Sequence, residues 1–232
     1  ATLPIFFSSI LADAPLKLSN TPQLSDVSTT LRLLMDMGSN FVLEEDGSIF
    51  IDSSTLTNLT AEYSLVKTMR ASILTLGPLL AKYKKAKISL PGGCAIGTRP
   101  VNLHLEALEK MGATIEVKNG YIYASTKGLV GAQINFGLIS VTATENIIMA
   151  ASLAKGITTI NNAAQEPEVT DLIRCIKKMG AKISGENTST LVIEGVDHLS
   201  GVEYTICPDR IEAGTYLVAA AITGGKITVN NI

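Results

Sequence analysis

The sequence predicts an α/β fold of three repeated units, each in the order helix, strand, helix, strand, strand, with the helices inside and the sheets outside. Three helical segments end alike, about 70 residues apart, in Met37-Gly38, Met111-Gly112 and Met179-Gly180. In each segment glycine follows the last periodic apolar residue, where a left-handed helix cap favours a residue without a side chain. This recurrence indicates one folding unit used three times.

The elements around the caps repeat as well. A short strand and a loop precede each capped helix, and these strands are expected at residues 16–18, 87–90 and 157–160. A two-stranded pattern follows each cap, with turns at Asp46-Gly47, Asn119-Gly120 and Asn187-Thr188. Asp-Gly and Asn-Gly are strong signals for a β-hairpin, so each unit is expected to end in one.

The first helix of a unit is apolar or small nearly all round, as in residues 141–154. A helix without a charged face is buried on every side, whereas second helices such as residues 102–111 carry charge on one face. We therefore expect the first helices inside. A fourth copy begins at Arg210, with a similarly buried helix over residues 213–222 and a strand over 226–229.

Composition excludes several classes of protein. Hydrophobic residues make up 46% and charged residues 17%, which is unlike a disordered chain. The net charge of −2 argues against a nucleic-acid partner. No apolar run reaches the ~18 residues of a membrane helix, and the apolar start lacks the features of a signal peptide. Three cysteines without close spacing argue against disulfides and a metal site, and favour a cytoplasmic setting.

Residues 90–103, LPGGCAIGTRPVNL, form the segment with the clearest chemical character. They replace the short strand-to-helix loop of the other units, and three glycines surround Cys94. Arg99-Pro100 stands at the start of the second helix, where the helix end and the guanidinium would stabilise a thiolate or bind an anion. The sequence therefore indicates a reactive thiol able to add to, or protonate, an unsaturated substrate.

Two alternatives for this segment stay open. In the first alternative, Cys94 is only a small residue in a loop. In the second the protein is a cysteine-dependent phosphatase, but such a loop needs five residues between cysteine and arginine, and here there are four.

Other polar residues are candidates with a structural alternative. Arg70 lies in a buried-type helix, so it must be paired with a repeat neighbour or reach a polar cleft. Residues 140–142 open a helix whose backbone donors favour phosphate, or Ser140 is an ordinary cap. His104 is either a supporting residue of the site or a satisfied core histidine. Cys175, in a helix, and Cys207, in a strand, are expected to be packing residues.

Several segments resemble the UDP-N-acetylglucosamine 1-carboxyvinyltransferase family: LVKTMRASI, SLPGGCAIGTRPV, LEKMGATI, NNAAQEPEVTDL and PDRIEAGTYLVAAA. They span almost the whole chain. The resemblance implies an inside-out α/β barrel, with two such domains in the enzyme. It implies transfer of enolpyruvyl from phosphoenolpyruvate to the 3-hydroxyl of UDP-N-acetylglucosamine, with release of phosphate and without a cofactor. This reaction opens peptidoglycan synthesis. The related shikimate-pathway transferases share the repeat but lack this cysteine loop.

The resemblance also implies roles for single residues. Cys94 would give a proton to the methylene of phosphoenolpyruvate, form a covalent adduct with it and be alkylated by fosfomycin. Arg70 and Arg99 would face the anionic substrates. Two strips would hold the uridine nucleotide: Arg99, Pro100, Val101, Asn102 and Leu103, and then Leu138, Ile139, Ser140 and Val141.

The chain departs from the family at several points. Asn102 stands where Asp is common, and Leu138 where some members have Lys. The chain begins inside the first helix of the family and ends soon after entering the second domain. We therefore expect residues 1–207 to form one domain and residues 208–232 to begin another. Because the missing domain supplies an aspartate base and an arginine, the chain alone is expected to be nearly inactive. The alternatives are a non-catalytic module that binds UDP-sugars and a shikimate-type transferase.

Overall fold

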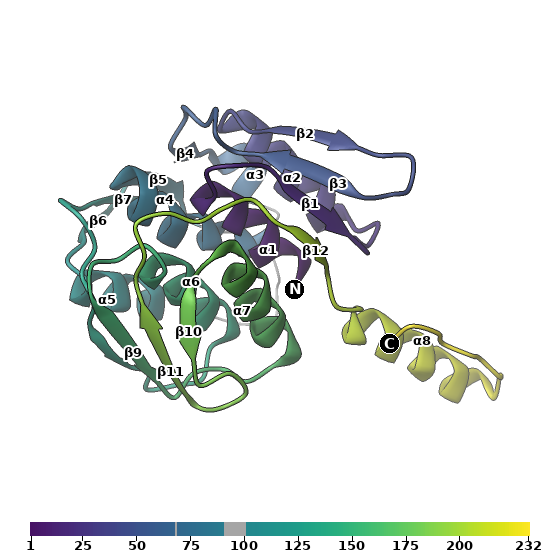
Figure 1. Ribbon diagram of the computed structural model, residues 1–232. Helices are drawn as coiled ribbons and strands as arrows, with labels where there is room; N and C mark the ends of the chain where they lie inside the picture. Colours follow the sequence, from purple (N-terminus) through teal and green to yellow (C-terminus); the bar gives the residue numbers. More distant parts are fainter. Residues whose placement is uncertain (68, 91–100) are drawn as a thin grey trace.

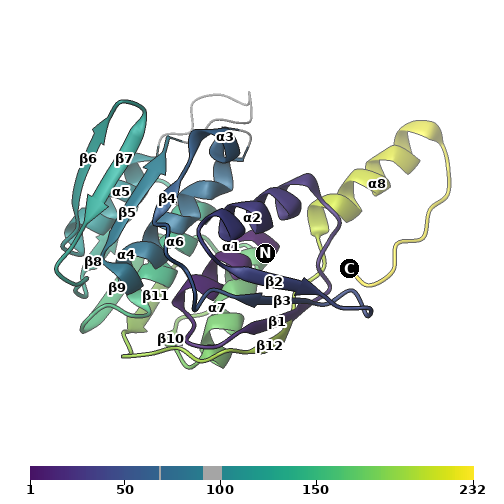
Figure 2. The same ribbon diagram turned by 90° about the horizontal axis from the view of Figure 1, so that it is seen from above.

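The computed structural model describes residues 1–67, 69–90 and 101–232. Three four-stranded β-sheets lie around a group of helices, and the last helix of the chain projects away from them (Figures 1 and 2). The α/β class expected from the sequence is confirmed.

The expected order of helix, strand, helix, strand, strand occurs three times, and an additional short strand precedes it in the second and third units. The first unit consists of α1 (Thr2–Ser8), the 3₁₀ turn η1 (Ser9–Leu11), β1 (Leu16–Ser19), α2 (Ser25–Asp36), β2 (Asn40–Leu43) and β3 (Ile49–Asp52). The second consists of β4 (Thr60–Ala61), α3 (Tyr63–Val66), the 3₁₀ turn η2 (Arg70–Thr75), α4 (Leu76–Tyr83), β5 (Lys85–Ser89), α5 (Asn102–Lys110), β6 (Thr114–Lys118) and β7 (Tyr121–Ser125). The third consists of β8 (Gln133–Asn135), α6 (Val141–Ala151), β9 (Ile157–Asn161), α7 (Pro167–Met179), β10 (Lys182–Ser184) and β11 (Thr190–Glu194). The chain then continues into β12 (Glu203–Thr205) and α8 (Arg210–Thr223).

The three sheets share one strand order: β12-β1-β3-β2, β4-β5-β7-β6 and β8-β9-β11-β10. In each sheet the expected short strand pairs antiparallel with the expected hairpin. On its other side it pairs in parallel with a short edge strand. The sequence predicted neither β4 nor β8, and it predicted a strand at Cys207, two residues beyond the end of β12. These edge strands have only two or three residues, which is too short for an alternating apolar pattern.

The expected glycine caps are present at the ends of α2, α5 and α7. Gly38, Gly112 and Gly180 have φ angles of 105°, 91° and 115°, a region that side chains disfavour. Each cap turns the chain directly into the first strand of a hairpin. The repeated Met-Gly signal therefore marks the same structural position three times.

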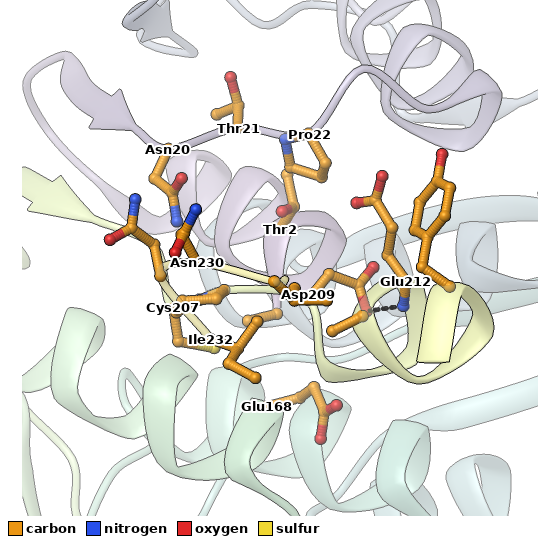
Figure 3. Close-up of a pocket in the computed structure, with 16 residues that line it drawn as sticks. Thr2, Asn20, Thr21, Pro22, Glu168, Cys207, Asp209, Glu212, Asn230 and Ile232 are labelled. Atoms are coloured by element: carbon orange, nitrogen blue, oxygen red, sulfur yellow. Dashed lines mark hydrogen bonds between the residues drawn. The ribbon is translucent and has the colours of Figure 1, made fainter. Parts of the chain in front are cut away.

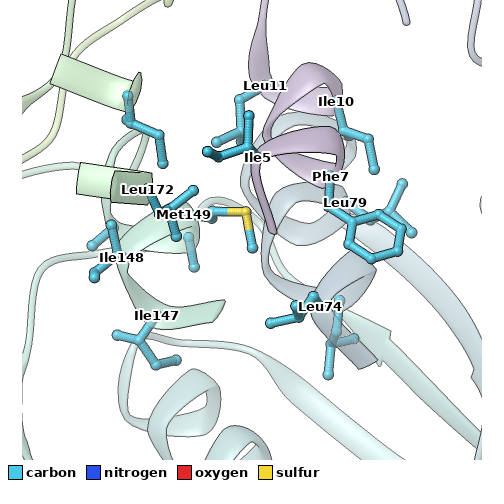
Figure 4. Close-up of a cluster of buried hydrophobic side chains, with 14 of the residues drawn as sticks. Ile5, Phe7, Ile10, Leu11, Leu74, Leu79, Ile147, Ile148, Met149 and Leu172 are labelled. Carbon is cyan, nitrogen blue, oxygen red and sulfur yellow. The ribbon is translucent and has the colours of Figure 1, made fainter. Parts of the chain in front are cut away.

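Helix α6 is buried on every side, as the sequence predicts. Every residue from Ala143 to Ala151 is buried. The helix contacts α1, α4, α5 and α7. Figure 4 shows its apolar side chains among those of α1, η1, η2, α4 and α7, namely Ile5, Phe7, Ile10, Leu11, Leu74, Leu79, Ile147, Ile148, Met149 and Leu172. Burying one such side chain stabilises the fold by about 1.5–3 kcal/mol.

Helix α8 does not follow the expectation of burial. Ala213 is its one buried residue, while Leu217, Val218 and Ile222 are 48%, 60% and 79% exposed. Figure 1 shows the helix standing away from the three sheets, so no other element of the described chain encloses it. The strand expected at residues 226–229 is also wrong, because these residues pair with no strand in the described part of the chain.

The approach of α4 to α6 gives a test of this packing. A Cβ atom on Gly77 would lie closer than 3.0 Å to two oxygens of Asn146. Gly77→Ala should therefore lower the free energy of unfolding by about 1–3 kcal/mol, measured by urea denaturation. Gly214→Ala is the matched control, since nothing lies within 4 Å of its Cβ position in α8. It should be neutral or stabilising by up to about 1 kcal/mol. Equal destabilisation of both variants would contradict the close approach.

Candidate functional site

Several candidate residues meet where α5, α6 and η2 begin. Arg70 is the first residue of η2, Asn102 the first of α5 and Val141 the first of α6. Hydrogen bonds between side chains join α5 to α6, and another joins α6 to the backbone of η2. The first turn of an α-helix carries unpaired N–H groups and the positive end of the helix dipole. Together with the Arg70 guanidinium, these groups make the region suited to an anion.

Cys94, Arg99 and Pro100 lie outside the described residues, so their predicted roles stay predictions. The described chain resumes at Val101, immediately before α5. Its carbonyl accepts the N–H of His104 at 3.0 Å, which begins the hydrogen bonding of the helix.

His104 lies in the interior and is 1% exposed. Its Nδ1 is 2.9 Å from Asn146 Nδ2, and its Nε2 is 3.4 Å from Thr142 Oγ1. Burial, followed by the positive charge of Arg70, lowers the pKa of His104 from 6.5 to about 3. His104 is thus a buried histidine with a partner at each ring nitrogen, and it is neutral at physiological pH.

Arg70 is half-buried, and it lies in a 3₁₀ turn instead of the buried-type helix that the sequence predicts. It begins a 3₁₀ turn, and Met69 just before it has an extended backbone. This break in the helix places the guanidinium near the start of η2, where its charge acts on His104.

The second predicted strip leads into α6. Leu138 and Ile139 are 73% and 60% exposed, which is unusual for large apolar side chains. Ser140 caps the helix, because its Oγ accepts the N–H of Ala143 at 3.3 Å. The cap interpretation of Ser140 is therefore confirmed, and the strip lies at the surface beside the helix N-terminus.

In the described part of the first strip, residues 101–103, one side chain is exposed and two are half-buried. Asn102 is exposed, and its Nδ2 donates to Glu106 Oε1 at 3.2 Å, one turn along α5. Val101 and Leu103 are half-buried against the core. The amide of Asn102 is therefore at the surface of the same region as the second strip.

Two buried polar residues of α6 escaped the sequence analysis. Glu145 and Asn146 stand side by side within an otherwise apolar helix, and both are at most 3% exposed. That adjacency is the signal that could have revealed them, because buried polar groups need partners. Asn146 binds three other segments. Burial, and then the negative charges of Glu168 and Glu166, raise the pKa of Glu145.

A cavity of about 400 Å³ lies elsewhere, between α1, the residues after β1 and the start of α8 (Figure 3). The described residues that line it include the charged side chains of Glu168, Asp209 and Glu212 but no lysine or arginine. Asp209 caps α8, and Glu168 accepts two hydrogen bonds from Arg210 at 2.8 and 3.2 Å. The ion pair and the cap at the start of α8 therefore have a structural role. Because its charged side chains are carboxylates, the cavity is unsuited to an anionic ligand.

The described cysteines have no chemical role in this arrangement. Cys175 is buried in α7, and Cys207 follows the end of β12 instead of lying in a strand. Burial, followed by the charge of Asp171, raises the pKa of Cys175 to about 12 and that of Cys207 to about 11. Both thiols are protonated at neutral pH and therefore poor nucleophiles.

Two features are absent from the part of the chain that the structure describes. No three His, Cys, Asp or Glu residues lie together as ligands for a metal ion. Across these same ranges, no helix has both the length and the apolar character to cross a bilayer.

The chain is similar to known proteins over its whole length. Residues 1–232 match the family model described as EPSP synthase (3-phosphoshikimate 1-carboxyvinyltransferase). Proteins named UDP-N-acetylglucosamine 1-carboxyvinyltransferase from Ruthia magnifica subsp. Calyptogena magnifica and from Vesicomyosocius okutanii subsp. Calyptogena okutanii (strain HA) are 74% and 73% identical over 232 residues. These matches cover 100% of this chain and 55% of each relative, so the chain spans about half the length of the curated relatives it matches.

A solved structure has the same fold. The crystal structure of the enolpyruvyl transferase NikO from Streptomyces tendae matches with a TM-score of 0.83 and 20% sequence identity. The match covers 94% of this chain and 52% of that chain. At this identity the likeness concerns the fold alone.

Glu145 gives a test of the electrostatics of the interior. Burial raises its pKa from 4.5 to about 8, so the folded chain keeps this proton over a range in which the unfolded chain has lost it. Stability is therefore lost as the pH rises from 4.5 to 8. Glu145→Gln should be equal to the unmodified chain near pH 4.5 and more stable by about 1–3 kcal/mol at pH 7, measured by urea denaturation. The exposed Glu109→Gln is the control, and the same pH-dependent gain there would refute the argument.

Proposed function

Because the chain belongs to the EPSP synthase family over all of its residues, we propose that it is part of a UDP-N-acetylglucosamine 1-carboxyvinyltransferase. The observation that carries this proposal is the 74% and 73% identity with proteins of that name. The whole enzyme would transfer enolpyruvyl from phosphoenolpyruvate to the 3-hydroxyl of UDP-N-acetylglucosamine, as the first step of peptidoglycan synthesis. We propose a cytoplasmic location for it.

In the proposed reaction, addition precedes elimination. The 3-hydroxyl oxygen of the sugar would bond to C2 of phosphoenolpyruvate and give its proton to the aspartate base of the second domain, while C3 receives a proton from the Cys94 thiol. In the elimination, the Cys94 thiolate would take a proton back from C3 as phosphate leaves C2 with the proton held by the aspartate, which restores the double bond in the product. The Arg70 and Arg99 guanidiniums would stabilise the anionic substrates through the charge that each carries at all physiological pH values.

The nucleotide would lie across the two strips at the starts of α5 and α6. The unpaired N–H groups of these helices and the positive charge of Arg70 support binding of its phosphates. Asn102 would contact the uracil with an amide, and Leu138 would leave one phosphate contact unmade. These residues therefore support a nucleotide site that departs in two positions from the family pattern.

The position of α8 supports a division of the chain. Residues 1–207 would form one domain, an inside-out α/β barrel of three units, and residues 208–232 would begin a second domain. The apolar side chains of α8 are exposed here, as expected of a helix that the remainder of a longer protein covers. The active site would lie between the two domains, so this chain alone would turn over substrate very slowly.

Calorimetric titration tests the substrate class. UDP-N-acetylglucosamine should bind the full chain, and Arg70→Ala should weaken that binding at least tenfold because a charge-assisted contact is lost. Shikimate 3-phosphate should not bind measurably. A phosphate-release assay with both substrates should show little or no turnover. Binding of shikimate 3-phosphate alone would favour the shikimate-type alternative, and turnover at the rate of a complete enzyme would refute the two-domain proposal.

The three thiols give a second test. Fosfomycin should alkylate Cys94 and leave Cys175 and Cys207 unmodified, because the pKa values of the latter two are raised by burial. Peptide mass mapping after incubation at pH 7.5 measures the labelling of each cysteine. Cys94→Ser should abolish it. Equal labelling of all three cysteines would contradict the assignment of Cys94 as the reactive thiol.

A further inference from the structure

The side-chain amide of Asn146 has one possible orientation. Its Oδ1 accepts the backbone N–H of Gly77 at 2.7 Å, and its Nδ2 donates to the backbone carbonyl of Ile73 at 3.0 Å. A backbone N–H can only donate and a backbone carbonyl can only accept. The two ends of the amide are therefore distinguished by partners of fixed role, and a flipped amide would break both hydrogen bonds.

This orientation decides where His104 carries its proton. The second hydrogen of Asn146 Nδ2 points to His104 Nδ1, 2.9 Å away, so Nδ1 must be the acceptor. The proton of the neutral ring is then on Nε2, from which it is directed to Thr142 Oγ1 at 3.4 Å. A second proton on Nδ1 would meet the amide hydrogen and would add a buried charge beside Arg70.

These contacts join the segments that flank the proposed nucleotide site. His104 directly follows residues 101–103, and Thr142 directly follows residues 138–141. Asn146, which is fully buried, ties the same ring to η2, the element that begins with Arg70. One amide and one imidazole therefore fix three separate segments relative to one another.

We propose that Asn146 and His104 form a positioning pair, which holds residues 101–103, residues 138–141 and the start of η2 in register and functions with His104 as the neutral Nε2–H tautomer. The part of this proposal that concerns the nucleotide rests on the proposed function. His104 touches no ligand in this account and acts through the backbone of α5. The tautomer can be tested without any ligand.

Nitrogen NMR tests the tautomer in the full chain. The chain has two histidines, so selective ¹⁵N labelling gives two rings, and His198→Asn identifies the exposed one. We expect the Nδ1 of His104 to give a pyridine-type shift and its Nε2 a pyrrole-type shift, both constant from pH 4.5 to 8. A proton on Nδ1, or titration of this ring within that range, would overturn the proposal.

Two substitutions separate positioning from simple filling of space. His104→Asn keeps an oxygen that accepts from Asn146, whereas His104→Leu fills the interior but leaves that donor unpaired. Calorimetry with UDP-N-acetylglucosamine should give a Kd within threefold of the unmodified chain for His104→Asn and at least tenfold weaker for His104→Leu. His198→Asn is the matched control and should bind as the unmodified chain does. All variants are compared after circular dichroism has shown that they are folded.

The outcomes are distinct. If His104→Leu binds as well as or better than His104→Asn, the residue only fills space and the proposal fails. If His104→Leu does not fold, the tautomer and the His104→Asn titration still decide the question. If the unmodified chain binds no UDP-N-acetylglucosamine while the ring shows the expected tautomer, the proposed function fails, and the role of the pair in nucleotide binding fails with it.

Discussion

Helix α6 has no side that can face water, and the arrangement of the whole molecule depends on that constraint. A single sheet covers one side of a helix, so complete enclosure requires elements from all three units. Helix α6 accordingly contacts α1 from the first unit, α4 and α5 from the second, and α7, β9 and β11 from its own. Because the pattern of about 70 residues occurs three times, the chain forms three similar sheets with their helices, and these together enclose α6.

The constraint also explains why the candidate site lies where it does. A helix enclosed along its sides can meet a ligand only at an end, and the N-terminal end of α6 carries unpaired N–H groups. The same enclosure buries polar side chains near that end, and these must find partners inside the protein. Asn146 meets this requirement with two backbone groups and one ring, so its hydrogen bonds also join neighbouring helices. The same hydrogen bonds therefore satisfy the buried amide of Asn146 and hold the neighbouring helices in place beside the candidate site.

Local signals predicted most of the fold. The glycine caps after α2, α5 and α7, the hairpin turns and the apolar character of α6 each depend on a few neighbouring residues, and the structure contains all of them. The edge strands and the exposure of α8 depend on contacts between segments that are distant in sequence. A few neighbouring residues do not predict such contacts. Within the site, Ser140 was recognisable as a cap, whereas Asn146 could not be interpreted without knowing that Ile73, Gly77 and His104 surround it.

The pairing of β12 with β1 has a consequence for how the chain is made. Ser19 and Thr205, whose hydroxyl groups are 2.9 Å apart, are separated by 186 positions in the chain. During synthesis on the ribosome, β1 must therefore keep an open edge until the third unit has emerged. Such an edge can pair with another nascent chain, and contacts so distant in sequence slow folding. Strand β12 thus closes the first sheet only after the elements of all three units have been made.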